Sequence, residues 1–346
     1  MAQDSGRSTE TPSSTRSLES PAMTETAVRP ALSDFVEALP HGIFVVDTGF
    51  HRPLFDAAYL VVENGRAAFV DTGTNASVPR LLAALDATGI ARSAVDYVVA
   101  THVHLDHAGG AGLLMQSLPN ARLVAHPRGA RHLVDPVHLI QGATAVYGAE
   151  EVERSYGTLQ PVPAERVLQT SDGMTLELAG RPLMFLDTPG HAMHHHCIWD
   201  AASRGWFTGD TFGLSYRDFD TAAGSWSMPT TTPVQFQPEA LRLSIERMLA
   251  YAPEWVYVTH YGRVGDVPRL ARLLLAQLDE MVAFARSVPS GANRHTELMR
   301  GLESIHLGSL RRHGVALEDE RIRELLALDL ELNAQGIAIW LDRTAA

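Results

Sequence analysis

The sequence predicts an α/β protein in which two strand-rich halves carry helices on their outer sides and a helical segment follows. Three observations support this fold class. Short apolar runs rich in β-branched residues recur before residue 265, amphipathic stretches of helical length separate several of them, and only helical periodicity remains beyond Gly265. With 346 residues, 45% of them hydrophobic, the chain can bury a large core.

Capping and turn signals predict the individual elements. A helix is expected over 77–90, because Ser77 can cap its start, Pro79 fits its first turn and Gly89 can end it. Strands are expected at 42–47, 57–63, 66–71, 94–100, 122–126, 174–179, 182–187, 195–200, 205–210 and 255–260. Further helices are expected at 111–118, 127–134, 238–250, 268–287, 296–312 and 319–334.

The chain divides into three predicted parts. Residues 1–35 are expected to form a disordered tail, because they are rich in Ser, Thr and Glu and poor in large apolar side chains, and Met23 offers a second start. Residues 36–265 form the predicted α/β domain, in which an insertion at 135–165 is expected near the functional site as a lid or wall. Residues 266–346 form a predicted helical C-terminal subdomain.

The charge and the cysteine usage restrict the partners and the compartment. A formal net charge of −12 argues against nucleic acid and anionic membranes as partners, because there is no basic surface to bind them. The chain has no apolar run near the roughly 18 residues that a membrane span needs. Cys197, the single cysteine, is expected to be a buried structural thiol. We therefore expect a cytoplasmic protein that acts on a small molecule.

Four of the predicted strands end on or just before ionisable side chains. Taken singly, an Asp at a strand end is usually a turn former, and a lone His is usually a satisfied core or surface residue. Four such ends in one chain indicate instead that the strand ends converge on one site. The side chains in question are His102, His104, Asp106, His107, His191, Asp210 and His260.

The donor atoms of these residues suit a transition metal. Imidazole and carboxylate ligands fit zinc, iron or manganese, and no thiolate is present among them to select zinc alone. His102 and His104 are two positions apart, so both can point to one side of an extended segment. Asp106 and His107 can both reach the site only if the chain leaves extended geometry there, and the Ala-Gly-Gly at 108–110 would allow a sharp turn into the next helix.

Four motifs at these strand ends together resemble the metallo-β-lactamase-fold hydrolases. They are T-H-x-H-x-D-H at 101–107, T-P-G-H at 188–191, T-G-D at 208–210 and T-H-Y-G at 259–262. The resemblance covers roughly residues 40–265 and implies a four-layer αβ/βα sandwich with metals at one rim of the sheets. Within that superfamily the chain looks most like the lactonase-like and glyoxalase-II-like hydrolases, and the helical C-terminal extension is similar to that of glyoxalase II.

The resemblance also implies a role for each motif residue. His102, His104 and His191 match the ligands of a first metal, Asp106, His107 and His260 match those of a second, and Asp210 matches the carboxylate that bridges the two. Asp71, in FVDTG, matches a position near the metals but outside their shell. Cysteine-ligated lactamases would need a thiol near the position of Asp210, which argues against an antibiotic-hydrolysing enzyme.

Three further residues are candidates for contact with the substrate. Tyr216 and Tyr261 follow metal-ligand segments and could donate a hydrogen bond to a substrate oxygen, although an ordinary packed tyrosine fits each equally well. His195 lies in a triplet of histidines whose side chains alternate between two faces of a strand, so we favour a supporting role for it over substrate binding. The tyrosine that lactonases carry three residues after the bridging Asp is Gly213 here.

The leading functional prediction is a dinuclear metal-dependent hydrolase acting on a small lactone, ester or thioester. A hydroxide bridging two divalent ions, zinc first and iron or manganese as alternatives, would be the nucleophile, and Asp106 and Asp210 are the predicted catalytic carboxylates. No Lys/Arg cluster that would hold glutathione carboxylates stands out in the helical extension.

Two other functions remain open at this point. Iron-dependent sulfur or oxygen chemistry could use the same ligands. A metal-stabilised, non-catalytic assembly protein could form a homodimer through the apolar stripe at Leu298, Leu302, Ile305 and Leu310, although burial in the core is the default for such a stripe.

Overall fold

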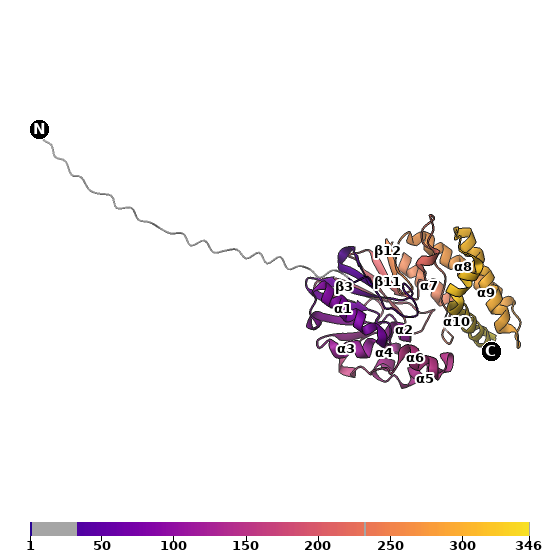
Figure 1. Ribbon diagram of the computed structural model, residues 1–346, viewed down its shortest axis with the longest axis horizontal. Coiled ribbons are helices and arrows are strands. Elements are labelled where there is room, and N and C mark those ends of the chain that lie inside the picture. The colour runs from indigo at the N-terminus through magenta and orange to yellow at the C-terminus, as the bar shows by residue number, and fades with distance from the viewer. Residues whose placement is uncertain (2–32, 232, 346) are drawn as a thin grey trace.

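The computed structural model describes residue 1, residues 33–231 and residues 233–345. Two mixed β-sheets lie face to face with helices on their outer sides, and the C-terminal helices pack beside the second sheet (Figure 1). The predicted α/β sandwich with a helical extension is therefore confirmed. Most of the predicted disordered tail, residues 2–32, lies outside the described residues.

The first sheet contains seven strands in chain order. They are β1 (Val36–Leu39), β2 (Ile43–Asp47), β3 (Ala57–Glu63), β4 (Arg66–Val70), β5 (Val95–Val99), β6 (Arg122–Ala125) and β7 (Val167–Gln169). The strands β1 to β4 pair antiparallel, and β4 to β7 pair parallel. β1 and β7 are absent from the prediction, because runs of four and three residues are too short to show a period of two.

The second sheet contains six strands in the order β13-β12-β11-β10-β9-β8. They are β8 (Thr175–Leu178), β9 (Arg181–Asp187), β10 (His196–Asp200), β11 (Gly205–Gly209), β12 (Trp255–Val258) and β13 (Gly262–Val264). The β11–β12 pair is parallel, and the other neighbours are antiparallel. Consequently β9, β11 and β12 all run in the same direction.

Alternation along the strands produces separate apolar layers. Val45 of β2 and Tyr59 of β3 face the second sheet, whereas Val46 and Leu60, one position along, pack beneath the outer helices. Strands buried on both faces explain why these segments are apolar at every position. The helices over the first sheet are α1 (Val78–Thr88), α3 (Ala111–Ser117) and α4 (Pro127–Val134).

The helices beside the second sheet are α7 (Pro238–Leu249), α8 (Val267–Ser287), α9 (Arg294–His313) and α10 (Asp319–Ala345). Leu298, Leu302 and Leu310 of α9 are fully buried, and Ile305 packs against the same apolar cluster as the second sheet. The stripe on α9 is therefore part of the core. No helix in the described part of the chain is both long and apolar enough to span a bilayer.

A buried ion pair joins β9 to β10. Arg181 and Asp200 are only 3% and 0% exposed, and the Arg181 Nε donates to Asp200 Oδ1 at 2.9 Å, while its Nη1 donates to the His41 carbonyl at 2.6 Å. Replacing Arg181 by leucine would leave the carboxylate buried and uncompensated, so we expect a loss of about 3–5 kcal/mol in the free energy of unfolding, measured by urea denaturation. Arg242→Leu, at an exposed pair, is the control and should cost less than about 1 kcal/mol; equal losses would contradict the prediction.

Candidate metal centre

The carboxyl ends of five strands meet at one rim of the sandwich. β4 and β5 are parallel neighbours in the first sheet, and β9, β11 and β12 share a direction in the second. The residues that follow these ends carry the imidazole and carboxylate groups singled out in the sequence. They are Asp71 after β4, His102, His104, Asp106 and His107 after β5, His191 after β9, Asp210 after β11 and His260 after β12.

The structure brings all seven candidate ligands together in two groups. Within each group one potential ligand atom per residue lies within 4.8 Å of the others, which is close enough for the group to hold a metal ion. One group contains His102, His104, His191 and Asp210, and the other contains Asp106, His107 and His260. The division into two groups matches the one that the sequence motifs imply.

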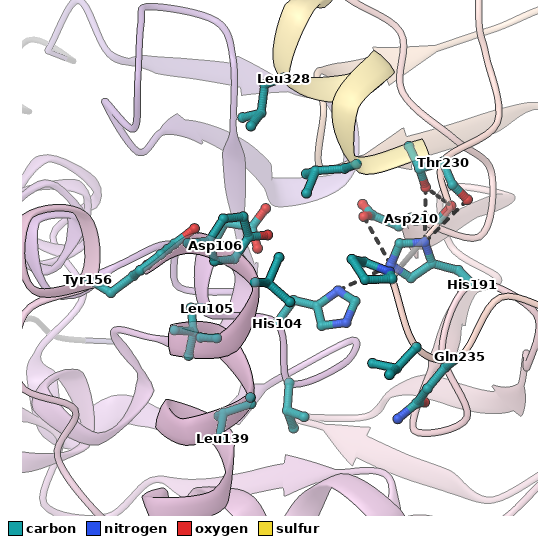
Figure 2. A pocket seen from close by; sticks show the side chains of 18 of the residues that line it. His104, Leu105, Asp106, Leu139, Tyr156, His191, Asp210, Thr230, Gln235 and Leu328 are labelled. Atoms are coloured by element: carbon teal, nitrogen blue, oxygen red, sulfur yellow. Dashed lines mark hydrogen bonds and ion pairs between the residues drawn. The ribbon is translucent and has the colours of Figure 1, made fainter. Parts of the chain in front are cut away.

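In the first group, one nitrogen of each imidazole ring lies close to a ring nitrogen of another member. His104 Nδ1 lies 2.7 Å from His102 Nε2 and 3.2 Å from His191 Nε2, and His191 Nε2 is 3.3 Å from Asp210 Oδ2. Figure 2 shows His104 and His191 pointing toward each other, with Asp210 beside them.

Asp210 also reaches the second group, through its other oxygen. Its Oδ1 lies 3.3 Å from His107 Nε2 and 3.6 Å from His260 Nε2, while Asp106 Oδ2 lies 3.7 Å and 3.5 Å from the same two nitrogens. One carboxylate thus presents one oxygen to each group. Asp210 is the residue that connects them.

The turn that carries Asp106 and His107 is the short helix α2 (Leu105–Ala108), so the chain does leave extended geometry after His104. Gly109 and Gly110 were predicted to allow a sharp turn, but the structure shows a different reason for glycine at this place. Gly109 and Gly110 have ordinary helical φ values of −61° and −83°. A Cβ on Gly110 would lie 2.6 Å from the Thr74 carbonyl oxygen, so close backbone packing requires glycine there.

In most candidate ligand rings, the nitrogen that points away from the other ligands has a hydrogen-bonding partner. Nδ1 of His102 lies 3.2 Å from Thr101 Oγ1, that of His191 lies 3.0 Å from Thr230 Oγ1, and that of His260 lies 2.9 Å from the Phe55 carbonyl oxygen. Metal-binding histidines usually have such a partner, which fixes the tautomer and the ring orientation.

Asp71 supports the centre through hydrogen bonds. Its Oδ2 lies 2.8 Å from His107 Nδ1 and accepts from Thr259 Oγ1 at 3.0 Å, and its Oδ1 accepts from the Thr101 backbone N–H at 2.8 Å and its hydroxyl at 2.9 Å. Thr101 follows β5 and Thr259 follows β12. This carboxylate therefore ties a candidate ligand to the ends of both sheets from outside the two groups.

The electrostatics of the two groups differ. Burial lowers the pKa of His102, His104 and His191, which keeps the rings neutral and able to bind a metal. Burial would also lower the pKa of His260, but Asp210 and Asp106 outweigh it and raise that pKa to about 10. The carboxylates of the second group therefore favour a cation at this position.

Two buried polar atoms at the centre also fit bound metal ions. His107 Nε2 and Asp210 Oδ1 are buried and make no hydrogen bond within the described part of the chain. Such atoms are costly in a folded protein unless a partner that is not part of the polypeptide satisfies them. Both are nitrogen or oxygen donors that a divalent transition metal accepts, so the residues present fit metal binding.

A loop tethered to α10 positions His191. The Asn333 side chain on α10 accepts from the Thr231 backbone N–H at 2.7 Å and donates to the Pro229 carbonyl at 3.3 Å, which fixes the segment that carries Thr230. Thr230→Val removes the hydroxyl beside His191 Nδ1, so we expect about tenfold weaker metal binding, measured by competition with a chromogenic chelator. Thr230→Ser keeps the hydroxyl and should bind metal normally; equal affinities in Val and Ser variants would exclude this role.

The three candidate substrate residues are buried in the protein interior. Tyr216 is fully buried, and its hydroxyl donates to Asp329 at 3.2 Å; Tyr261 is 7% exposed and packs between the sheets. His195 lies behind the centre, where its Nδ1 is 2.9 Å from Thr188 Oγ1 and its Nε2 accepts from the Asp210 backbone N–H at 3.2 Å. None of the three is among the residues that line the cavity described next. The two tyrosines have the packed positions that the sequence left open, and His195 has the supporting position that the sequence favoured.

A cavity of about 530 Å³ opens onto the centre. His104, Asp106, His191, Asp210 and His260 form its base. The predicted insertion folds into α5 (Val137–Tyr147) and α6 (Ala149–Tyr156), which form one wall, and α10 forms another. Figure 2 shows Leu139 and Tyr156 from the first wall and Leu328 from the second.

Several residues that shape the centre have no recognisable pattern in the sequence. Thr230 lies in a loop with no periodic pattern, and Asp329 and Asn333 lie on a helix about a hundred residues further along the chain. Cys197 is fully buried as predicted, and burial raises the pKa of its thiol to about 12, so it is an unreactive core residue.

Comparison with known proteins agrees with this fold and centre. A model of the metallo-β-lactamase superfamily matches residues 51–260. The chain is 27% identical over 188 residues to a metallo-β-lactamase fold-containing protein of Sulfurisphaera tokodaii, a match that covers 53% of this chain and 66% of that relative. It is 30% identical over 218 residues to a hydroxyacylglutathione hydrolase of Acidiphilium cryptum, covering 62% of this chain and 68% of the relative.

A solved structure supports the same assignment at the level of the fold. A metallo-β-lactamase family protein of Thermus thermophilus superposes with a TM-score of 0.60 at 23% identity, over 82% of this chain and 95% of that one. Two facing sheets, strand ends that converge on one rim, and a family match over more than half of the chain define its class. The chain belongs to the metallo-β-lactamase superfamily. That superfamily includes hydrolases.

Proposed function

We propose that this protein is a dinuclear metal-dependent hydrolase of small acyl substrates. The single observation that carries the proposal is the position of Asp210, whose Oδ2 faces the first group of candidate ligands and whose Oδ1 faces the second. A carboxylate shared in this way is suited to hold two cations close together, the arrangement of two-metal hydrolytic sites. A closed structural site needs neither a second ion nor an adjoining cavity.

The proposed ligands follow the two groups. His102, His104, His191 and Asp210 would hold one ion, and Asp106, His107, His260 and Asp210 would hold the other. When bound, the ions supply Lewis acidity toward an acyl carbonyl and lower the pKa of water. Zinc is the first candidate, and iron or manganese fits the same nitrogen and oxygen donors.

The protein's own contribution is to orient these groups and exclude bulk water. Asp106 lines the cavity, and part of its side chain is exposed there, so its carboxylate can accept a hydrogen bond from an attacking water and orient it. Phe50, Phe55 and Leu105 also line the cavity and place apolar surface beside its polar base, which strengthens electrostatic interactions with a polarised carbonyl.

The acyl class of substrate is supported by the relatives and by the charge of the chain. One relative is a hydroxyacylglutathione hydrolase, an enzyme that acts on a thioester. A net charge of −12 disfavours a nucleic acid or another polyanionic phosphodiester. A lactone, ester or thioester therefore fits better than a phosphodiester.

Metal analysis combined with a substrate panel tests the proposal. Protein purified without added chelator should contain close to two transition-metal ions per chain and hydrolyse at least one member of a panel of lactones, esters and thioesters, while phosphodiesters remain intact. Bound iron together with oxygen consumption and no hydrolysis would instead favour redox chemistry on the same ligands. Stoichiometric metal without any turnover would favour a non-catalytic role.

A further inference from the structure

The cavity has mostly apolar walls above a polar base. Leu139, Ala143 and Val146 of α5 face it from one side, and Leu328 and Leu332 of α10 face it from the other. Although α5 is an apolar helix, it has no fully buried residue, so its apolar side chains remain available to a molecule in the cavity. These walls suit an aliphatic acyl group.

The walls of the cavity have few Lys or Arg side chains that could bind a negatively charged group. Arg154 of α6 is the one Lys or Arg among the described residues that line the cavity. Its side chain is 75% exposed, and its guanidinium already pairs with Glu151. An anionic substituent would therefore leave water without gaining a buried Lys or Arg as a partner, which is unfavourable.

One acidic side chain interrupts the apolar wall of α10. Asp329 lines the cavity, and within the described chain its hydrogen-bond donor is the Tyr216 hydroxyl, 3.2 Å from Oδ2 and 3.4 Å from Oδ1. Arg52, the nearby cation, lies over the Tyr216 ring and donates to Asp218 at 3.1 Å instead. Burial raises the pKa of Asp329 to about 7.

Asp329 therefore has unused capacity to accept hydrogen bonds. When Asp329 is ionised, its two oxygens offer about four acceptor positions, and one hydroxyl occupies at most a part of them. The other polar residue of α10 at the cavity, Asn333, is already committed to the Pro229 and Thr231 backbone. Asp329 is thus the polar group of this wall that remains open to a bound molecule.

We propose that Asp329 recognises a hydrogen-bond donor, a hydroxyl or an ammonium group, on an otherwise apolar acyl substrate. This inference rests on the proposed hydrolase function and narrows its substrate class. We expect the protein to prefer acyl groups that carry such a donor over plain acyl groups. Acyl groups with a free carboxylate should be the poorest substrates. In this respect the cavity differs from one built for a glutathione thioester, because glutathione has two carboxylates.

Matched methyl esters test the proposal. The metal-loaded protein is assayed with plain, ω-hydroxy, ω-amino and ω-carboxy acyl esters of hexanoyl and octanoyl length, and release of acid is followed with a pH indicator. We expect kcat/KM about tenfold higher for the hydroxy or amino ester than for the plain ester, with the carboxy ester lowest. The hydroxy and amino members show which donor Asp329 prefers. A carboxy ester that is the best substrate would overturn the proposal.

Variants on α10 separate recognition from a general effect. Asp329→Asn keeps an oxygen for the Tyr216 hydroxyl but loses the charge, and it should remove the roughly tenfold preference by lowering kcat/KM for the hydroxy and amino esters more than for the plain ester. Asp329→Ser serves if the Asn variant does not fold. Glu324→Gln, which removes an exposed charge from the same helix, should keep the preference. An unchanged preference in both Asp329 variants, or an equal loss with every ester, would overturn the role of Asp329.

A binding measurement keeps this test apart from the proposed function. Calorimetric titration with hexanoate and 6-hydroxyhexanoate requires no turnover. Tighter binding of the hydroxy acid by the wild type, lost in Asp329→Asn, would support recognition even if no ester in the panel is hydrolysed. Equal binding of the two acids by a protein that does hydrolyse esters would overturn the recognition proposal and leave the hydrolase proposal standing.

Discussion

Asp210→Ala is expected to abolish hydrolysis and to reduce the metal content of the purified protein. The reason is that one carboxylate contacts both groups of candidate ligands, His191 through Oδ2 and His107 and His260 through Oδ1. Its removal would deprive both proposed ions of a ligand and would leave the imidazoles of the two groups without the negative charge between them. We expect kcat/KM to fall by roughly a thousandfold or more, since electrostatic stabilisation by metal ions is worth several kcal/mol.

Metal content and activity must be measured on the same preparation. Inductively coupled plasma mass spectrometry gives the ions per chain, and the best ester or lactone of the panel gives kcat/KM. Asp279→Ala removes an exposed carboxylate far from the centre and should retain both values. An Asp210→Ala variant with full metal content and undiminished activity would refute the dinuclear assignment.

Asp71→Asn is expected to destabilise the fold and to weaken metal binding. The carboxylate accepts from Thr101 and Thr259 at the ends of two different sheets and orients His107. An amide keeps one acceptor oxygen but turns its NH₂ toward a donor, so at least one buried group loses its partner. We expect a loss of about 3 kcal/mol in the free energy of unfolding of the metal-free protein and 10- to 100-fold weaker metal binding.

Asp71→Asn isolates the contribution of the hydrogen bonds that Asp71 accepts. Asp71 has a left-handed φ of 58°, which asparagine tolerates, so backbone strain does not confound the result. Asp266→Asn is a matched control, because Asp266 also has a left-handed φ, of 49°, but is exposed and pairs with Arg269 on the surface. Urea denaturation should show little change for the control. A similar small change for Asp71→Asn would mean that its hydrogen bonds contribute little.

Strand positions and strand ends could be predicted because they depend on local patterns. Apolar runs such as 57–63 have a length and composition typical of buried strands, and the structure places β3 at the same residues. The polar residues after each run are then brought together by the common direction of the strands, which a sheet with parallel neighbours imposes. This is why the seven candidate ligands could be found without the structure.

The cavity could not be predicted, because its walls come from segments distant in the chain. Asp329 and Asn333 have no local feature that distinguishes them from other polar residues on an amphipathic helix. Tyr261 follows His260 in the turn between β12 and β13, where strand alternation gives no signal for the side chain, and it packs between the sheets. Tyr216 has no such signal either, since its burial depends on how the loop after β11 packs against α10.

The composition of the two ligand groups has a consequence for how the molecule holds together. Each group draws ligands from both halves of the chain, and the contact between His104 and His191 joins residues 87 positions apart. An ion bound by either group would act as a removable cross-link between the sheets, restricting the unfolded chain much as a disulfide that closes a long loop does. Neither half contains a complete set of ligands, so the centre is a property of the junction between them.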